Sequence, residues 1–192
     1  MSVQVVGGEF GGRKLDCPSG ISVRPMMARV KNAVFNILFD RVKGAKVLDL
    51  YAGSGGLGIE ALSRGAESAV FVEKDPVHAE VLRRNVEKLG LSSKCRVLVQ
   101  DNQAAFRSLE REGRSFTLLL ADPPFSKDRK ELPPEVFVDL EALSASPVWA
   151  PGGMLVLEHR SGEPPYPEAL AKRMTDRREY GDATVVWFSA PV

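Results

Sequence analysis

The strongest constraint on the fold is a strict alternation of short apolar runs and amphipathic segments that begins at Lys46. The apolar runs predict strands over 47–50, 69–73, 96–99, 116–121 and 154–158, and the segments between them predict helices over 58–63, 75–89, 103–112 and 134–143. A short helix near 168–173 and a hairpin of 177–180 against 184–188 should follow. Strands and helices in strict alternation are typical of an α/β doubly wound fold. We therefore predict a mostly parallel, seven-stranded sheet into which the terminal hairpin puts one antiparallel strand.

The first residues follow a different pattern. Residues 3–6 and 13–15 flank a glycine-rich stretch and predict a small β-hairpin. An apolar stripe at helical spacing then predicts a helix; its members are Val30, Ala33, Val34, Ile37 and Leu38. We predict an N-terminal hairpin appendage over residues 1–24 and an α/β domain over residues 25–192.

Charge is unevenly distributed along the chain. The net charge is only +1, but residues 1–46 hold eight Lys or Arg residues against three acidic residues, and the remainder is mildly acidic. A basic first quarter suits contact with a polyanion, for which Arg13, Lys14, Arg24 and Arg29 are the candidate phosphate contacts. Ordinary solvated faces would explain the same charges equally well.

Composition excludes several classes of protein. A chain of 192 residues with 44% hydrophobic and 27% charged residues is neither disordered nor fibrous. No apolar run approaches the roughly 18 residues of a membrane span, and no signal peptide opens the chain, so we expect a cytoplasmic protein with no membrane partner. Cys17 and Cys95 fit no zinc spacing, and His78 and His159 have no second ligand nearby, so we expect no metal.

A glycine-rich stretch directly after the first strand of the sheet predicts a nucleotide-containing ligand. Gly53, Gly55 and Gly58 satisfy the GxGxxG pattern, which is also found in dinucleotide-binding proteins. Asp49, however, stands four residues before the first glycine and would repel a pyrophosphate. The same carboxylate would attract the ammonium and sulfonium of S-adenosylmethionine. The combination therefore favours this cofactor over a dinucleotide.

Acidic residues also end the next two strands. Glu73 ends the second strand and is expected to accept hydrogen bonds from ribose hydroxyls, which would suit either cofactor. Asp101 and Asn102 end the third strand and could face adenine, although a helix N-cap explains Asp101 equally well. We add the neighbouring Ala52 and Lys74 to the expected cofactor contacts.

The feature that decides the predicted chemistry is the run Asp122, Pro123, Pro124 and Phe125 after the fourth strand. Two prolines make a rigid elbow that projects a carboxylate and backbone carbonyls. Such acceptors can bind the two hydrogens of an exocyclic amine and stabilise the charge that develops when its nitrogen attacks a methyl group. The aromatic ring can stack on a base taken out of its helix. Paired prolines also occur in plain loops, but the two other pairs in this chain have neither a strand-end Asp before them nor an aromatic residue after them.

At these residues the chain resembles the class I S-adenosylmethionine-dependent methyltransferases that modify exocyclic or amide nitrogens. Further stretches are similar to the bacterial family that methylates N2 of a guanine in 16S ribosomal RNA; they are residues 7–15, 23–25, 29–31, 35–38 and 177–181. The resemblance implies S-adenosylmethionine as cofactor and small-subunit ribosomal RNA as partner, either free or in an assembled or partly assembled particle. One departure is that Met26 and Met27 stand where the family usually follows Arg-Pro with threonine.

The main hypothesis is therefore methyl transfer to the N2 amine of a guanosine, with residues 122–125 as the catalytic group. The same chemistry on an adenine amine in DNA or a glutamine amide in protein is the nearest alternative. An NAD-dependent oxidoreductase and a non-catalytic RNA-binding module are more distant ones. The sequence does not identify the guanosine or the oligomeric state.

Overall fold

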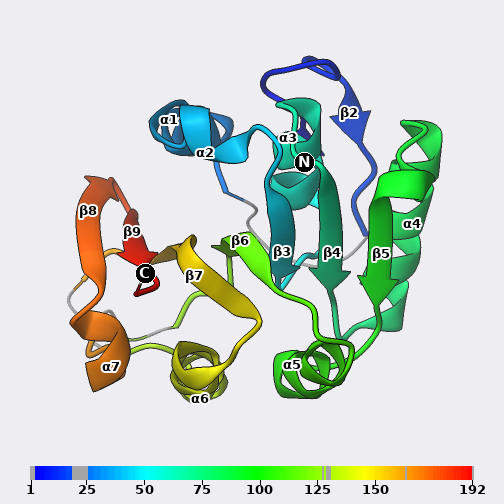
Figure 1. Ribbon diagram of the computed structural model, residues 1–192. Helices are drawn as coiled ribbons and strands as arrows, with labels where there is room; N and C mark the ends of the chain where they lie inside the picture. Colours follow the sequence, from blue (N-terminus) through cyan, green and yellow to red (C-terminus); the bar gives the residue numbers. More distant parts are fainter. Residues whose placement is uncertain (1–2, 19–25, 127, 129–130, 163, 192) are drawn as a thin grey trace.

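The computed structural model describes residues 3–18, 26–126, 128, 131–162 and 164–191. These residues form a seven-stranded sheet in the spatial order β5-β4-β3-β6-β7-β9-β8 (Figure 1). The strands are β3 (Lys46–Leu50), β4 (Ser68–Val72), β5 (Cys95–Leu98), β6 (Phe116–Ala121), β7 (Trp149–Arg160), β8 (Met174–Tyr180) and β9 (Ala183–Ser189). Neighbouring strands are parallel except where β9 runs antiparallel to β7 and β8. The predicted doubly wound sheet with one antiparallel strand is confirmed.

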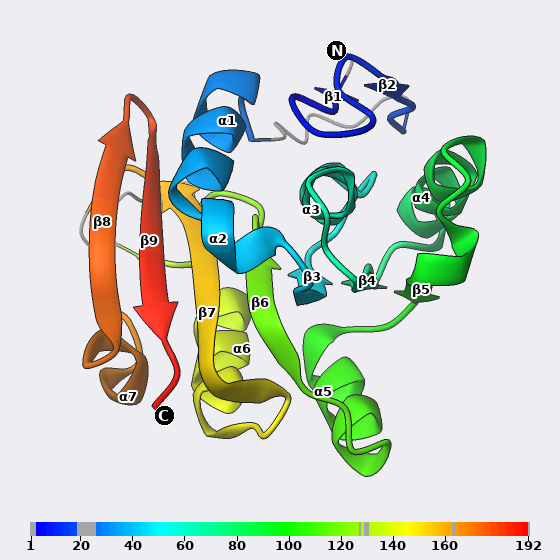
Figure 2. The same cartoon turned by 45° about the horizontal axis from the view of Figure 1, so that its top comes forward.

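Helices cover both faces of the sheet (Figure 2). One face carries α1 (Ala28–Ile37), α2 (Phe39–Val42), α3 (Gly56–Ser63) and α4 (Pro76–Lys88). The other face carries α5 (Asn102–Arg111), α6 (Pro134–Ala145) and α7 (Glu168–Ala171). A single 3-10 turn, η1 (Ser92–Lys94), precedes β5. Within the described ranges, no helix has the length and apolar character needed to cross a membrane.

The two faces of the sheet bury separate apolar cores. In β6, Leu118 and Leu120 pack with the first group of helices, while Leu119 and Ala121 pack with the second. A strand covered on both faces must be apolar throughout, which explains the unbroken run that made β6 recognisable in the sequence. Each such buried leucine contributes about 1.5–3 kcal/mol relative to an exposed one.

Several elements differ in length from the prediction, and in two of them glycines explain the difference. Strand β7 begins at Trp149, five residues before the predicted start, and passes through Pro151, Gly152 and Gly153. Its pairing with β6 shifts register there, and a Cβ on Gly153 would lie 2.8 Å from the carbonyl oxygen of Ala150. The glycines therefore build an irregularity within the strand and do not end it. Helix α3 begins at Gly56, two residues before the predicted start, because Gly55 adopts a left-handed conformation (φ 88°) as its N-cap.

The N-terminal hairpin is present and packs against helix α3 (Figure 2). Its strands β1 (Val3–Gln4) and β2 (Lys14–Leu15) are antiparallel and short. The backbone N–H groups of Val6 and Gly7 donate to the Glu60 carboxylate at 2.7 and 2.9 Å. A Cβ on Gly8 would lie 1.9 Å from the carbonyl oxygen of Ser63, so only glycine permits this close approach.

The hairpin also contributes to the protein core. Val3, Val5 and Leu15 are buried in the same apolar cluster as the helices of the first face. The division of the chain at residue 24 stays a prediction, and residues on its two sides share this core.

Candidate active site

The predicted site residues that end strands meet at one edge of the sheet. Leu50 pairs with Val72 on one side and with Ala121 on the other. The residues that follow these strands therefore lie next to one another. This edge lies where the chain order reverses between β3 and β6, the position at which ligands bind open α/β sheets.

The glycine loop after β3 is fixed by backbone contacts. The Gly53 N–H donates to Oε2 of Glu73 at 2.8 Å, and the Gly55 N–H donates to the carbonyl oxygen of Ala52 at 2.8 Å. A Cβ on Gly53 would meet nothing closer than 4.0 Å, so the backbone is open to a ligand there. Gly58 has another purpose: a Cβ there would lie 2.3 Å from the Phe71 ring, so this glycine allows the helix to pack on the sheet.

Asp49 is buried below this loop, with 2% of its surface exposed. Its Oδ2 accepts a hydrogen bond from the Gly58 N–H at 2.8 Å, close to the N-terminus of α3. Burial raises the pKa of Asp49 well above its ordinary value, and the hydrogen bond from Gly58 opposes that shift. A carboxylate in this state would be stabilised by a nearby cation. Its contact with the cofactor ammonium stays a prediction.

Glu73 connects two loops of the site. Its Oε2 binds Gly53, and its Oε1 accepts from the Asp75 N–H at 2.8 Å. Each carboxylate oxygen has a second lone pair, so both can still accept a ligand hydroxyl. Lys74, beside it, is exposed. The expected ribose contact of Glu73 stays a prediction.

Asp101 and Asn102 have different surroundings. Asp101 is exposed and caps α5, since its Oδ1 accepts from the Ala104 N–H at 2.7 Å. Asn102 is buried, and its Nδ2 donates to Oδ2 of Asp139 at 2.8 Å. Among the described residues its Oδ1 has no hydrogen-bond partner. The N-cap interpretation of Asp101 is confirmed, and a contact of either residue with adenine stays a prediction.

Sequence reasoning missed two residues of this region. The Tyr51 hydroxyl donates to Oδ2 of Asp139 at 2.7 Å, so Asp139 on α6 holds both Tyr51 and Asn102. A usable signal existed, because Asp139 lies within the apolar face of α6 that Val136 and Leu140 define. An acidic residue on the buried face of a helix needs a partner.

The elbow after β6 places Asp122 at the same edge. Its Oδ2 accepts a hydrogen bond from the Met26 N–H at 3.1 Å. Burial raises the pKa of Asp122 to about 7, although the Met26 hydrogen bond and the positive charge of Lys31 lower it. Pro123 is buried, Pro124 is exposed and the Phe125 ring is half-buried. Both the protonated and the ionised form of this carboxyl are therefore populated near neutral pH.

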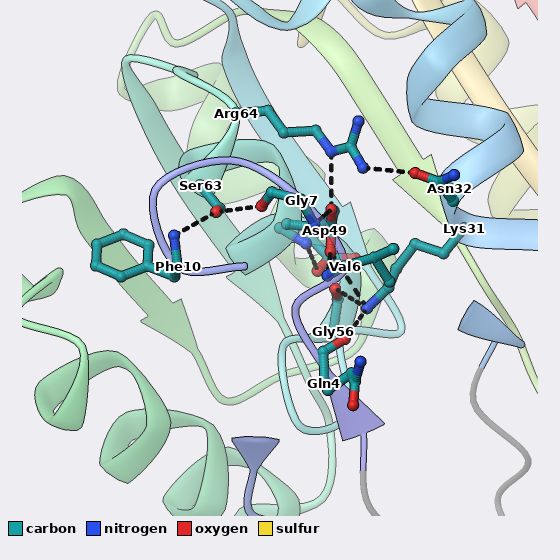
Figure 3. A network of polar contacts seen from close by, with 12 residues as sticks. Gln4, Val6, Gly7, Phe10, Lys31, Asn32, Asp49, Gly56, Ser63 and Arg64 are labelled. Carbon is teal, nitrogen blue, oxygen red and sulfur yellow. Dashed lines mark hydrogen bonds and ion pairs between the residues drawn. The ribbon is translucent and has the colours of Figure 1, made fainter. Parts of the chain in front are cut away.

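The basic residues of the first quarter fall into two groups. Arg13, Lys14 and Arg29 are exposed, as a phosphate contact requires, while Arg24 lies outside the described residues. Lys31 is buried, and it donates to the carbonyl oxygen of Gln4 at 2.7 Å (Figure 3). Its Nζ also lies 3.5 Å from the Glu60 carboxylate. The charge of Lys31 is therefore paired with Glu60 inside the protein.

The histidines and cysteines form no metal site in the described part of the chain, where no cluster of three metal-ligating side chains occurs. His159 is buried, with Nε2 2.6 Å from the Tyr166 hydroxyl and Nδ1 2.7 Å from the carbonyl oxygen of Arg160. Burial lowers its pKa. His159 is thus a buried side chain with a partner for each ring nitrogen.

Comparison with known proteins places the chain in a family. Residues 3–189 match the family model described as "Conserved hypothetical protein 95". The chain belongs to this family. It is 32% identical over 180 residues to a Bacillus subtilis protein named "Putative rRNA methyltransferase YlbH", a match that covers 93% of this chain and 94% of that protein.

Two further matches have more specific names. The ribosomal RNA small subunit methyltransferase D of Escherichia coli strain K12 is 36% identical over 125 residues, which cover 65% of this chain and 61% of that protein. A solved T. thermophilus 16S rRNA N2 G1207 methyltransferase (RsmC), in complex with AdoMet and guanosine, superposes with a TM-score of 0.74. That match is 21% identical and covers 99% of this chain and 50% of the other. The expected class I methyltransferase fold is confirmed.

Proposed function

We propose that the protein transfers a methyl group from S-adenosylmethionine to the N2 amine of a guanosine in small-subunit ribosomal RNA. One observation carries the proposal: the Asp122 elbow and the glycine loop end adjacent strands, with Leu50 and Ala121 in register, at the reversal point of the sheet. The names of the family's relatives support ribosomal RNA as the substrate class, and the RsmC structure supports guanine. A ribosomal RNA substrate supports a cytoplasmic location for the activity.

Three features of the edge fit the proposed cofactor. The backbone at Gly53 is open to a ligand, the buried Asp49 carboxylate would be stabilised by an ammonium, and the Asn102 Oδ1 is a buried acceptor suited to an amino group such as that of adenine. Glu73 would accept from ribose hydroxyls beside the loop, with Ala52, Gly55, Lys74 and Asp101 as the remaining contacts. When bound, S-adenosylmethionine supplies an electrophilic methyl group on a sulfonium.

The residues of the elbow would orient the attacking amine. Oδ2 of Asp122 accepts from the Met26 N–H, so Oδ1 would accept one amine hydrogen and the Pro123 carbonyl would accept the other. These acceptors stabilise the positive charge that forms on nitrogen and fix the line of attack. Phe125 would stack on the guanine, while the rigid Pro124 keeps the ring and the carboxylate in one geometry. Because the product cation is acidic, its proton leaves without a strong base.

The basic residues Arg13, Lys14, Arg24 and Arg29 are proposed to bind RNA phosphates. Free RNA and a partly assembled particle both offer such phosphates. The test therefore offers both free RNA and small subunits as substrates.

The decisive experiment supplies purified protein with methyl-labelled S-adenosylmethionine and 16S ribosomal RNA from cells that lack this enzyme, either free or in small subunits. Nucleoside analysis should find label in N2-methylguanosine in at least one arm. Label in adenosine, or label only in DNA or protein offered as competitors, would overturn the guanine assignment. No transfer to any of these substrates would overturn methyl transfer itself.

A further inference from the structure

Helix α6 supplies a carboxylate that joins two separate walls of the proposed cofactor site. Oδ2 of Asp139 accepts from the Tyr51 hydroxyl at 2.7 Å and from the Asn102 Nδ2 at 2.8 Å. Tyr51 opens the glycine loop after β3, and Asn102 opens α5 after β5. Since β4 lies between β3 and β5, no backbone pairing joins these two segments directly.

Both residues held by Asp139 need support. Tyr51 is the only non-glycine among the described residues with a positive φ, at 56°, a conformation that is unfavourable for an aromatic residue. Asn102 is 5% exposed. If residue 139 were apolar, the Asn102 Nδ2 group would lose the carboxylate acceptor to which it now donates. The Asp139 carboxylate satisfies both groups at one point.

The glycine loop is thus held from two sides. Glu73 binds the loop through the Gly53 N–H at 2.8 Å, and Asp139 holds its first residue through the Tyr51 hydroxyl. Only the second carboxylate also reaches α5. The distance between the loop and the Asn102 acceptor therefore depends on Asp139.

We propose that Asp139 is a positioning residue that sets the spacing between the glycine loop and the N-terminus of α5, and thereby the affinity for the adenosine part of the cofactor. This inference rests on the proposed function, since it takes the two segments as walls of the S-adenosylmethionine site. Asp139 itself touches Tyr51 and Asn102 and is not required to touch the cofactor. Asp122 lies on another loop, where its carboxylate accepts from the Met26 N–H.

The test is calorimetric titration of the intact protein with S-adenosylhomocysteine, together with a melting curve for every variant. Asp139→Leu removes the acceptor at similar size and should raise the Kd roughly tenfold, the loss expected for a hydrogen-bonded pair of this kind. Asp139→Asn keeps one oxygen acceptor and should stay within about threefold of the wild type. Tyr51→Phe removes a single hydroxyl, keeps the ring, and should raise the Kd by about threefold even if Asp139→Leu fails to fold.

Leu143→Ala is the matched control, because Leu143 is fully buried on the same helix and contacts neither wall through a side-chain hydrogen bond. It should lower the melting temperature and leave the Kd unchanged. An unchanged Kd in both Asp139→Leu and Tyr51→Phe would overturn the proposal, as would an equal rise in Leu143→Ala. If the wild type binds S-adenosylhomocysteine while these variants bind equally well, only the positioning role fails. If the wild type does not bind it, the proposed function fails and this inference with it.

Discussion

The backbone N–H of Met26 donates a hydrogen bond to Oδ2 of Asp122 across 96 residues of sequence. The contact brings the start of α1 to the elbow after β6. The contact does not depend on the side chain at position 26, because any residue except proline supplies this N–H. One oxygen of Asp122 is thereby fixed, and the orientation of the other follows.

Replacement of this acid should separate catalysis from cofactor binding. We expect Asp122→Ala to abolish methyl transfer and to leave the affinity for S-adenosylhomocysteine nearly unchanged, because Asp122 is assigned to the amine. Turnover assays and calorimetry on the same preparation check both halves. Wild-type turnover, or a main defect in cofactor binding, would contradict the assignment.

The raised pKa of Asp122 predicts a pH dependence. With a pKa of about 7 in the folded protein, the carboxyl loses its proton as the pH rises, so kcat/KM should increase up to about pH 7 and then level off. Asp122→Asn should be slow and should lack this transition. A wild-type profile that stays flat between pH 5 and 8 would remove Asp122 from the rate-determining chemistry.

The same pKa affects stability. A carboxyl whose pKa rises from 3.8 to about 7 on folding favours the folded state fully below pH 4, and this contribution is lost as the pH rises through 7. The melting temperature of Asp122→Asn should therefore rise relative to that of the wild type as the pH increases from 5 to 8. Equal differences at the two pH values would show that the folded protein binds no extra proton at this site.

Glu73 should matter for the cofactor in two ways. Glu73→Ala would remove the expected ribose acceptor and also release the backbone N–H groups of Gly53 and Asp75. We expect cofactor binding to weaken by about 1–3 kcal/mol. Glu73→Gln keeps an oxygen for one of the two N–H groups and should lose less. Calorimetry that finds the alanine variant unimpaired would leave Glu73 as a purely structural residue.

Removal of the N-terminal hairpin tests its two roles. The basic charge of the hairpin predicts that deletion of residues 1–20 leaves cofactor binding intact and weakens RNA binding. The packing against α3 adds a further expectation: because Glu60 loses the N–H groups of Val6 and Gly7, the melting temperature should also fall. Melting, cofactor affinity and RNA affinity of one truncated protein distinguish the roles. Equal losses in all three would argue against RNA binding by the hairpin.

Charge reversal at Arg13 and Lys14 avoids that loss of packing, since both side chains are exposed. The double variant should melt like the wild type and bind RNA less tightly. The slope of log affinity against log salt should decrease by up to about one unit per lost phosphate contact. An unchanged slope would assign these charges to ordinary solvated faces.

The sequence predicted those parts of the site that local patterns determine. Glu73 and Asp122 each follow an apolar run, and the carboxyl ends of parallel strands meet at one edge, so their placement followed from the order of elements. Asp139 could not be assigned in this way. Its partners lie 88 and 37 residues away, and only the packing of α6 brings it to Tyr51 and Asn102.

The basic first quarter of the chain also contains a buried residue. Lys31 is one of the eight Lys and Arg residues counted there, and composition does not tell which of these side chains fold inward. In the structure Lys31 is 2% exposed beside Glu60. Its apolar neighbours Val30 and Val34 predicted the helix but not the ion pair between Lys31 and Glu60.

The docking of the hairpin on Glu60 has a consequence for how the chain folds during synthesis. Strands β1 and β2 can pair with each other early, but the carboxylate that anchors them is made 53 residues after Gly7. A nascent chain released at residue 50 would hold a hairpin with nothing to dock on. Residues 3–15 should therefore stay open to proteolysis until α3 has been made and has folded, although they precede it in the chain.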